Sequence, residues 1–135
     1  MDKTTVTVIG AGLAGVEAAW ALANRGFHVR LCEMKPEKYS PAHKYKGFAE
    51  LVCSNSLKSA DTASACGMLK EEMRYMNSVT MRAAEKTKVG AGGALAVNRT
   101  EFSDAVTQMI TEHPYIEIVN GEITEFPKSL SLIHI

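Results

Sequence analysis

Long apolar runs are missing from this sequence of 135 residues. A helix that crosses a membrane needs roughly 20 consecutive apolar residues, and no segment approaches that length. Residues 1–10 (MDKTTVTVIG) also lack the basic stretch, the apolar core and the small-residue cleavage site of a secretory signal peptide. We therefore expect a cytoplasmic protein that has no membrane partner.

Cysteine is scarce, and neither sign of charge is in excess. The three cysteines, Cys32, Cys53 and Cys66, form no CxxC pair, so we predict neither a disulfide framework nor a zinc site. The histidines are scattered along the chain, and we expect no metal site. The formal net charge is zero, which by itself gives no support for nucleic-acid binding.

The sequence does contain a GxGxxG pattern in an informative context. Residues 5–9 (TVTVI) are β-branched and apolar, as in a strand buried within a parallel sheet. Residues 10–15 (GAGLAG) interrupt this strand, residues 16–24 favour a helix, and Gly26 stands where that helix would end. Residues 28–33 (HVRLCE) predict a second strand. This order predicts a βαβ unit of the Rossmann type, which binds dinucleotides.

Each glycine of the pattern has a physical role. Gly10 permits a tight turn, Gly12 lets the backbone approach the diphosphate, and Gly15 lets helix and strand pack closely. The N–H groups and dipole of the helix start favour the phosphate charge. We expect the following residues to bind the cofactor there: Gly10, Ala11, Gly12, Leu13, Ala14 and Gly15. Glu33 ends the second strand, where a carboxylate accepts both ribose hydroxyls and repels the 2′-phosphate of NADP.

The remaining segments predict helices, strands and loops. Apolar periodicity predicts helices over residues 61–76 and 101–113, and residues 78–85 either extend the first of these or begin another. Strands are expected over residues 115–119 and from 121 to 126. Residues 35–56 predict a long irregular loop, and residues 89–97 (VGAGGALAV) predict a turn at the sheet edge.

We therefore predict an α/β fold with a Rossmann-type FAD-binding βαβ domain. Its parallel sheet is incomplete, as expected if the chain is truncated. Residues 1–128 are assigned to the N-terminal part of this domain. Residues 129–135 (SLSLIHI) carry no turn or cap signal, and we expect them to be a non-native tail.

The choice of FAD over NAD rests on a resemblance, because both cofactors share the ADP half. The N-terminal fingerprint, continued by Ala19, Gly26, Val29 and Leu31, resembles the glutathione-reductase-like flavoproteins. In those proteins an arginine followed by a helix also lies near the cofactor. Arg99, before the predicted helix 101–113, is similar to that element.

Several further blocks are more specific. They are residues 33–36 (EMKP), 41–43 (PAH), 48–57 (FAELVCSNSL), 69–74 (LKEEMR) and 91–97 (AGGALAV), with Arg99 and the pair Phe102 and Ser103. Together they resemble the N-terminal part of the folate- and FAD-dependent tRNA (uracil-5-)-methyltransferases, within the glucose-inhibited division protein A superfamily. Three positions depart from the family's pattern: Lys35 stands for Arg, Gly90 for Pro and Asn98 for Asp.

This resemblance implies a specific reaction. A one-carbon unit passes from methylenetetrahydrofolate, by way of reduced FAD, to C5 of a uridine in the T-loop of tRNA, and NAD(P)H supplies the reducing equivalents. It also implies a functional cysteine at Cys53, acting by covalent addition, by acid–base chemistry or by shielding the flavin. The alternative is that Cys53 only packs its loop. Cys32 and Cys66 are expected to be small buried residues.

Other interpretations stay open. His43, with its neighbours Tyr39, Lys44, Tyr45 and Lys46, fits contacts with RNA phosphates and bases, and fits a solvated basic loop equally well. The function could also be that of the related flavoprotein which modifies the wobble uridine of tRNA. A third interpretation is an inactive FAD-binding fragment, and we expect the chain alone to be inactive.

Overall fold

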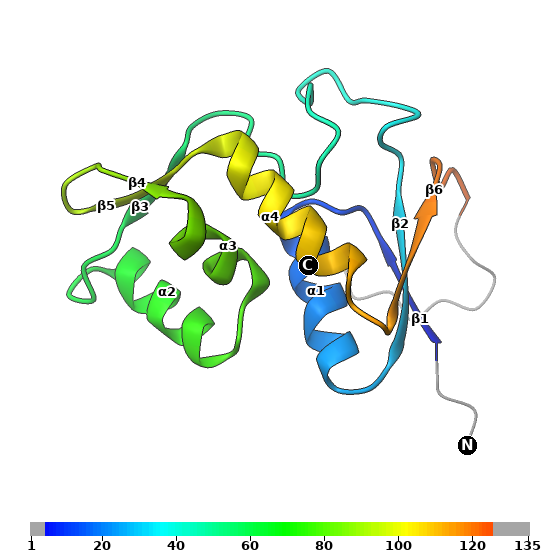
Figure 1. Ribbon diagram of the computed structural model, residues 1–135, viewed down its shortest axis with the longest axis horizontal. Coiled ribbons are helices and arrows are strands. Elements are labelled where there is room, and N and C mark those ends of the chain that lie inside the picture. The colour runs from blue at the N-terminus through cyan, green and yellow to red at the C-terminus, as the bar shows by residue number, and fades with distance from the viewer. Residues whose placement is uncertain (1–4, 126–135) are drawn as a thin grey trace.

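A three-stranded parallel sheet forms one side of the computed structural model, which describes residues 5–125 (Figure 1). Its strands are β1 (Thr5–Ile9), β2 (His28–Glu33) and β6 (Ile116–Asn120), in the order β1-β2-β6. The central strand β2 pairs in parallel with both neighbours and buries Val29 and Leu31. The strands predicted at 5–9 and 28–33 are confirmed, and the third begins one residue later than predicted.

Two helices pack against this sheet. α1 (Leu13–Asn24) follows the glycine turn and contacts β1 and β2, while α4 (Arg99–Thr111) contacts β6. α1 ends before Gly26, whose φ of +87° is a left-handed conformation that glycine adopts at little cost. The side chain of Asn98 caps α4 by accepting two N–H groups of its first turn. Fully buried apolar side chains fill the core: Val16, Val29, Leu31, Phe102, Val106 and Ile110.

The segment between β2 and α4 builds a second, antiparallel sheet and two helices. The strands are β3 (Ser56–Ser59), β4 (Lys88–Val89) and β5 (Ala94–Val97), in the order β3-β5-β4. The helices are α2 (Ala65–Tyr75) and α3 (Val79–Thr87). α3 contacts both α1 and α4, and Figure 1 shows this part on the side of α1 and α4 away from the parallel sheet.

The second sheet corrects one expectation and adds a strand that the sequence does not predict. Residues 89–97 do not turn at the edge of the parallel sheet: they contribute to an antiparallel hairpin of another sheet, with Gly92 at φ +60°. The sequence does not predict β3, because a strand of four residues depends on its pairing partner more than on its own pattern.

The strand predicted from residue 121 onward is wrong over its described part. Residues 121–125 form no strand. Gly121 adopts a φ of +120° and donates its N–H to the carbonyl of Glu33 at 2.9 Å. This bond turns the chain across the end of the parallel sheet. Residues 129–135, assigned above to a tail, lie outside the described residues.

The first predicted helix, residues 61–76, starts later than expected because Ser64 caps α2 by accepting the N–H of Gly67. Asn77, at φ +62°, separates α2 from α3, so residues 78–85 belong to a second helix. Apolar side chains of α2 are exposed, with Met68 at 49% and Leu69 at 55%, and Met76, directly after the helix, is exposed as well. Within residues 5–125, no helix is long and apolar enough to cross a membrane.

Candidate functional site

The glycine turn joins β1 to α1 as the sequence predicts. Gly10 adopts a φ of +92° and donates its N–H to the carbonyl of Cys32 at 2.7 Å, which closes the turn against β2. A Cβ atom on Gly15 would lie 1.8 Å from the carbonyl oxygen of Gly10. The tight turn and the close packing expected of these two glycines are therefore confirmed.

Gly12 differs from the other two glycines. Its φ is −73°, which any residue adopts, and a Cβ atom placed there would meet no atom within 4 Å. Nothing in the described protein therefore requires glycine at this position. Gly12 is also the N-cap of α1, and no side chain caps the helix, so the first N–H groups are left to an outside acceptor. Both observations fit an anionic group lying against the backbone.

The carboxylate of Glu33 is buried beside this turn. Its Oε2 accepts the N–H of Ala11 at 2.7 Å, and its Oε1 accepts the N–H of Lys35 at 2.9 Å. A carboxylate has about four acceptor positions, so one on each oxygen remains for a pair of ligand hydroxyls. The structure thus brings Glu33 to the glycine turn, as the fingerprint predicts.

A cleft of about 330 Å³ lies between these groups. Its walls are residues 9–12 of the glycine turn, residues 32–35 at the end of β2, and residues 121–123 after β6, with His43 and Glu50. An ion pair of 2.5 Å between Glu122 and Lys38, which lies three residues beyond the segment 32–35, joins the chain after β6 to the chain after β2. Residues 121–123 are not predicted at the site by any local pattern, although they follow a strand that ends beside β2, where ligands of parallel sheets bind.

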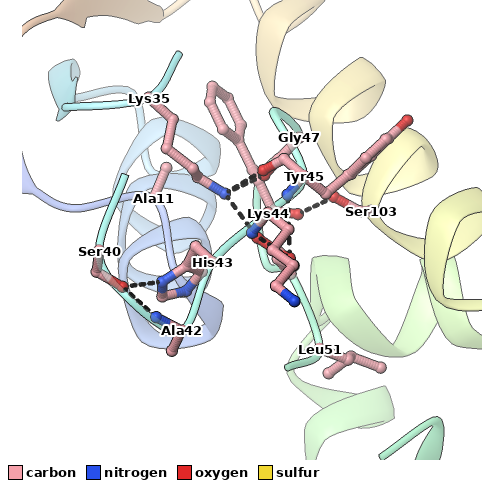
Figure 2. A network of polar contacts seen from close by, with 12 residues as sticks. Ala11, Lys35, Ser40, Ala42, His43, Lys44, Tyr45, Gly47, Leu51 and Ser103 are labelled. Atoms are coloured by element: carbon pink, nitrogen blue, oxygen red, sulfur yellow. Dashed lines mark hydrogen bonds and ion pairs between the residues drawn. The ribbon is translucent and has the colours of Figure 1, made fainter. Parts of the chain in front are cut away.

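Lys35 and Glu50 hold the loop that borders the cleft. The buried ammonium of Lys35 donates to the carbonyls of Tyr45 at 3.1 Å and Gly47 at 2.5 Å, and lies 3.6 Å from Glu50 Oε2 (Figure 2). Glu50 Oε1 accepts the N–H groups of Lys44 and Tyr45. Burial raises the pKa of Glu50, but these two N–H groups, Lys35 and His43 together outweigh it, so the pKa lies below its ordinary value.

Cys53 lies in the next part of this loop, at the meeting point of two hollows. It is exposed and lines an apolar groove of about 630 Å³ together with Leu13, Leu51, Leu57 and Met73. It also lines a second pocket of about 430 Å³ with Asn55, Asn98 and Arg99. The guanidinium of Arg99 donates to the carbonyl of Leu51 at 3.4 Å.

The apolar groove and the cleft meet at the start of α1. Gly12 lines the cleft, Leu13 and Ala14 line the groove, and Glu50 lines both. The cleft of the glycine fingerprint therefore adjoins the groove of the Cys53 loop, and Cys53 in turn lines the pocket that contains Arg99. Of the other cysteines, Cys32 is buried as predicted, but Cys66 is only half-buried. Among the residues that the structure describes, no group of three His, Cys, Asp or Glu side chains is arranged to hold a metal ion.

Two solved structures resemble this fold at low sequence identity. The p-nitrophenol 4-monooxygenase PnpA of Pseudomonas putida gives a TM-score of 0.55 at 13% identity, with 87% of this chain and 32% of that chain covered. A variant of 2-methyl-3-hydroxypyridine-5-carboxylic acid oxygenase gives a TM-score of 0.52 at 14% identity, with 89% and 32% covered. These likenesses show a shared α/β fold.

Sequence relatives are much closer. Over 123 residues the chain is 58% identical to the methylenetetrahydrofolate--tRNA-(uracil-5-)-methyltransferase TrmFO of Acetivibrio thermocellus, which covers 91% of this chain and 28% of that protein. The protein of the same name from Bacillus subtilis is 54% identical over 133 residues, 98% of this chain and 31% of that protein. The chain thus spans under a third of the length of these relatives. The profile of the family described as glucose inhibited division protein A matches residues 5–134. The chain therefore belongs to the glucose inhibited division protein A family.

Proposed function

We propose that this chain is the FAD-binding segment of an enzyme that methylates C5 of a uridine in the T-loop of tRNA, with methylenetetrahydrofolate as the carbon donor and NAD(P)H as the reductant. The observation that carries the proposal is that the glycine cleft and the Cys53 groove adjoin at the first turn of α1 and share Glu50. The names and identities of the two TrmFO relatives support folate-dependent methylation of uracil C5 in tRNA, and the T-loop and the NAD(P)H reductant are added from the family resemblance.

The cleft suits the ADP half of FAD. The backbone at Gly12 and the uncapped N–H groups of α1 face the diphosphate, and Glu33 keeps free acceptor positions for the ribose hydroxyls. A carboxylate there repels the 2′-phosphate of NADP, so NADPH, where it is the reductant, binds elsewhere. The groove that begins at Leu13 is lined mainly by apolar side chains, which suits a flat aromatic ring system.

Bound FAD supplies the redox chemistry that turns a methylene group into a methyl group. The chain's own contribution is to hold the reacting groups together and to keep water away from them. The groove has an apolar wall formed by Leu13, Ala14, Leu51, Leu57 and Met73. Arg99 holds the Cys53 loop by donating a hydrogen bond to the carbonyl of Leu51. A rigid wall of this kind favours a single orientation of the reacting groups.

Cys53 is our candidate for a residue that acts on the base. Uracil C5 is a poor nucleophile until a nucleophile adds to C6, and a thiolate is suited to that addition. The exposed position of Cys53 at the rim of the groove is compatible with addition at C6 and with proton transfer at C5. Its exposure argues against the alternative of a residue that only packs its loop.

Reconstitution of the intact protein, meaning the full-length enzyme of which we propose this chain to be a segment, tests this function. Purified protein should be yellow, and with labelled methylenetetrahydrofolate and NADH or NADPH it should transfer label to unmodified tRNA. Digestion of the tRNA should place the label on C5 of a T-loop uridine. Label at the wobble uridine would favour the related modification enzyme, and a protein that stays colourless after addition of FAD would refute the proposal.

A further inference from the structure

His43 lies on the cleft and not among the exposed basic residues of its loop. It is half-buried and lines the same cavity as the glycine turn and Glu33, whereas Lys44 and Lys46 are exposed. Tyr45, the other neighbour, donates its hydroxyl to Asp104 at 2.5 Å, which ties its ring to α4. The residues that fit RNA contacts by sequence therefore do not share one surface. Lys44 and Lys46 are exposed, whereas His43 faces the nucleotide cleft.

The imidazole of His43 is held in a defined orientation. The backbone N–H of His43 donates to the carbonyl of Ser40 at 3.1 Å, and the ring Nδ1 lies 2.6 Å from the hydroxyl of Ser40 (Figure 2). The same hydroxyl accepts the N–H of Ala42 at 3.3 Å, which leaves its own hydrogen free to donate to Nδ1. A neutral imidazole that accepts at Nδ1 carries its proton on Nε2. In the tautomer that accepts at Nδ1, the ring therefore presents Nε2–H as a hydrogen-bond donor.

A donor in this cleft complements phosphate. The ribose hydroxyls need acceptors, which Glu33 provides, whereas the oxygens of a diphosphate can only accept. The other carboxylate on the cleft, Glu50, accepts the N–H groups of Lys44 and Tyr45 at Oε1, and its Oε2 lies 3.6 Å from Lys35. The nearby His43 also lowers the pKa of Glu50. We propose that His43, oriented by Ser40, donates Nε2–H to the diphosphate of the bound nucleotide, together with the first turn of α1. This inference rests on the proposed function, and it makes His43 a cofactor-binding residue.

Binding of ADP and FAD to the apo form of the intact protein tests this assignment. Calorimetry with ADP should show a Kd about tenfold higher for His43→Ala than for the unchanged protein, as for loss of a charge-assisted hydrogen bond. The affinity for FAD, measured by the quenching of flavin fluorescence on binding, should fall by a similar factor. Adenosine, which has no phosphate and is measured by competition with ADP, should bind both proteins equally. His43→Gln, which keeps an N–H near the position of Nε2, should regain most of the affinity, while His43→Asn should not.

Lys44→Ala is the matched control, because it removes a charge from the same loop without touching the cleft. It should leave the ADP affinity unchanged, and His43→Ala should leave the tRNA affinity unchanged. Equal ADP affinity in His43→Ala and the unchanged protein would overturn the inference and leave the proposed function standing. A loss of tRNA affinity in His43→Ala without a loss of ADP affinity would also overturn the inference, because it would mean that His43 contacts RNA. A lower melting temperature of the apoprotein without recovery in His43→Gln would mark a structural role and also overturn it. Failure of the unchanged protein to bind ADP or FAD would refute the proposed function itself.

Discussion

The carboxylate of Glu17 on α1 accepts hydrogen bonds from both the backbone N–H and the hydroxyl of Thr80 in α3, at 2.9 Å and 2.5 Å. The hydroxyl of Ser78, which caps α3, donates to the same oxygen at 2.5 Å. A negative charge at a helix N-terminus is favourable, and both hydroxyl residues are buried. Glu17 therefore links α3 to α1, the helix that follows the glycine fingerprint.

Replacing Glu17 with alanine should destabilise the protein. The substitution leaves the buried donors of Ser78 and Thr80 without their acceptor, at a cost of about 2 kcal/mol. Urea denaturation of the intact protein measures this loss. Glu72→Ala, at an exposed position of α2, is the control and should change the free energy of unfolding by under about 0.5 kcal/mol. Equal stability of Glu17→Ala and the control would mean that other contacts hold α3 in place.

Substitutions of Gly12 and Gly15 should have opposite consequences. A Cβ atom at Gly12 meets no atom within 4 Å, and the position needs no unusual backbone conformation, so the apoprotein of Gly12→Val should fold while flavin binding is lost. Alanine at Gly15 places a Cβ against the Gly10 carbonyl and should lower the melting temperature of the apoprotein itself. Circular dichroism of the apoprotein and flavin absorbance separate the two effects. Flavin retained by Gly12→Val would show that the diphosphate does not lie against this backbone.

The sequence predicts the parallel part of the fold well, and the reason is local. The strands at Thr5–Ile9 and His28–Glu33 are apolar segments bounded by Gly10 and Gly26, and these glycines mark the boundaries without any knowledge of the fold. The short strands of the second sheet have no such boundaries. Their two to four residues are extended because each pairs with another strand, and a pairing partner cannot be read from a local pattern.

The site shows the same division. The fingerprint residues and Glu33 are recognisable because their spacing along the chain reflects their geometry. Residues 121–123 reach the cleft only because β6 pairs with β2, and His43 reaches it because Lys35 and Glu50 fold the loop back. Contacts between residues so distant in sequence carry no periodic signal, so only the structure reveals them.

Glu50 should make the stability of the protein depend on pH. Its pKa is lowered in the folded state from an ordinary value of 4.5, so its stabilising effect is present above that value and is lost as the pH falls through the lower folded-state pKa. Glu50→Gln should therefore be less stable than the unchanged protein at pH 7, by about 1.5 to 3 kcal/mol, the range for hydrogen bonds to a charged group. The difference should shrink in strongly acidic buffer. Urea denaturation at both pH values measures it, and a gap that is the same at both would contradict the assignment.

Lys35 stands where the pattern of the methyltransferase family has arginine. Replacing Lys35 with arginine should stabilise the loop that borders the cleft. Glu50 Oε2 is buried and receives no hydrogen bond, since the Lys35 ammonium is 3.6 Å away. The guanidinium has five donors in a planar fork, so it can satisfy this oxygen while keeping the carbonyls of Tyr45 and Gly47. We expect a gain of about 1 kcal/mol in the free energy of unfolding. The gain should disappear in the background of Glu50→Gln, and a gain that persists there would have another cause.

Cys53→Ala should separate catalysis from cofactor binding. Cys53 lines the groove beyond the first turn of α1, and the groups that face the diphosphate and ribose lie in the adjoining cleft, so flavin content should stay unchanged. If the thiol acts on the uracil, the rate of tRNA methylation should fall by about an order of magnitude or more, mainly in kcat. Cys66→Ala is the matched control, because Cys66 is half-buried on α2 and should not affect the rate. Methylation by Cys53→Ala at the unchanged rate would leave Cys53 as a packing residue of its loop. A parallel loss of flavin and activity would instead mean that the loop supports the cofactor, and that the chemical group acting on the base belongs to another residue.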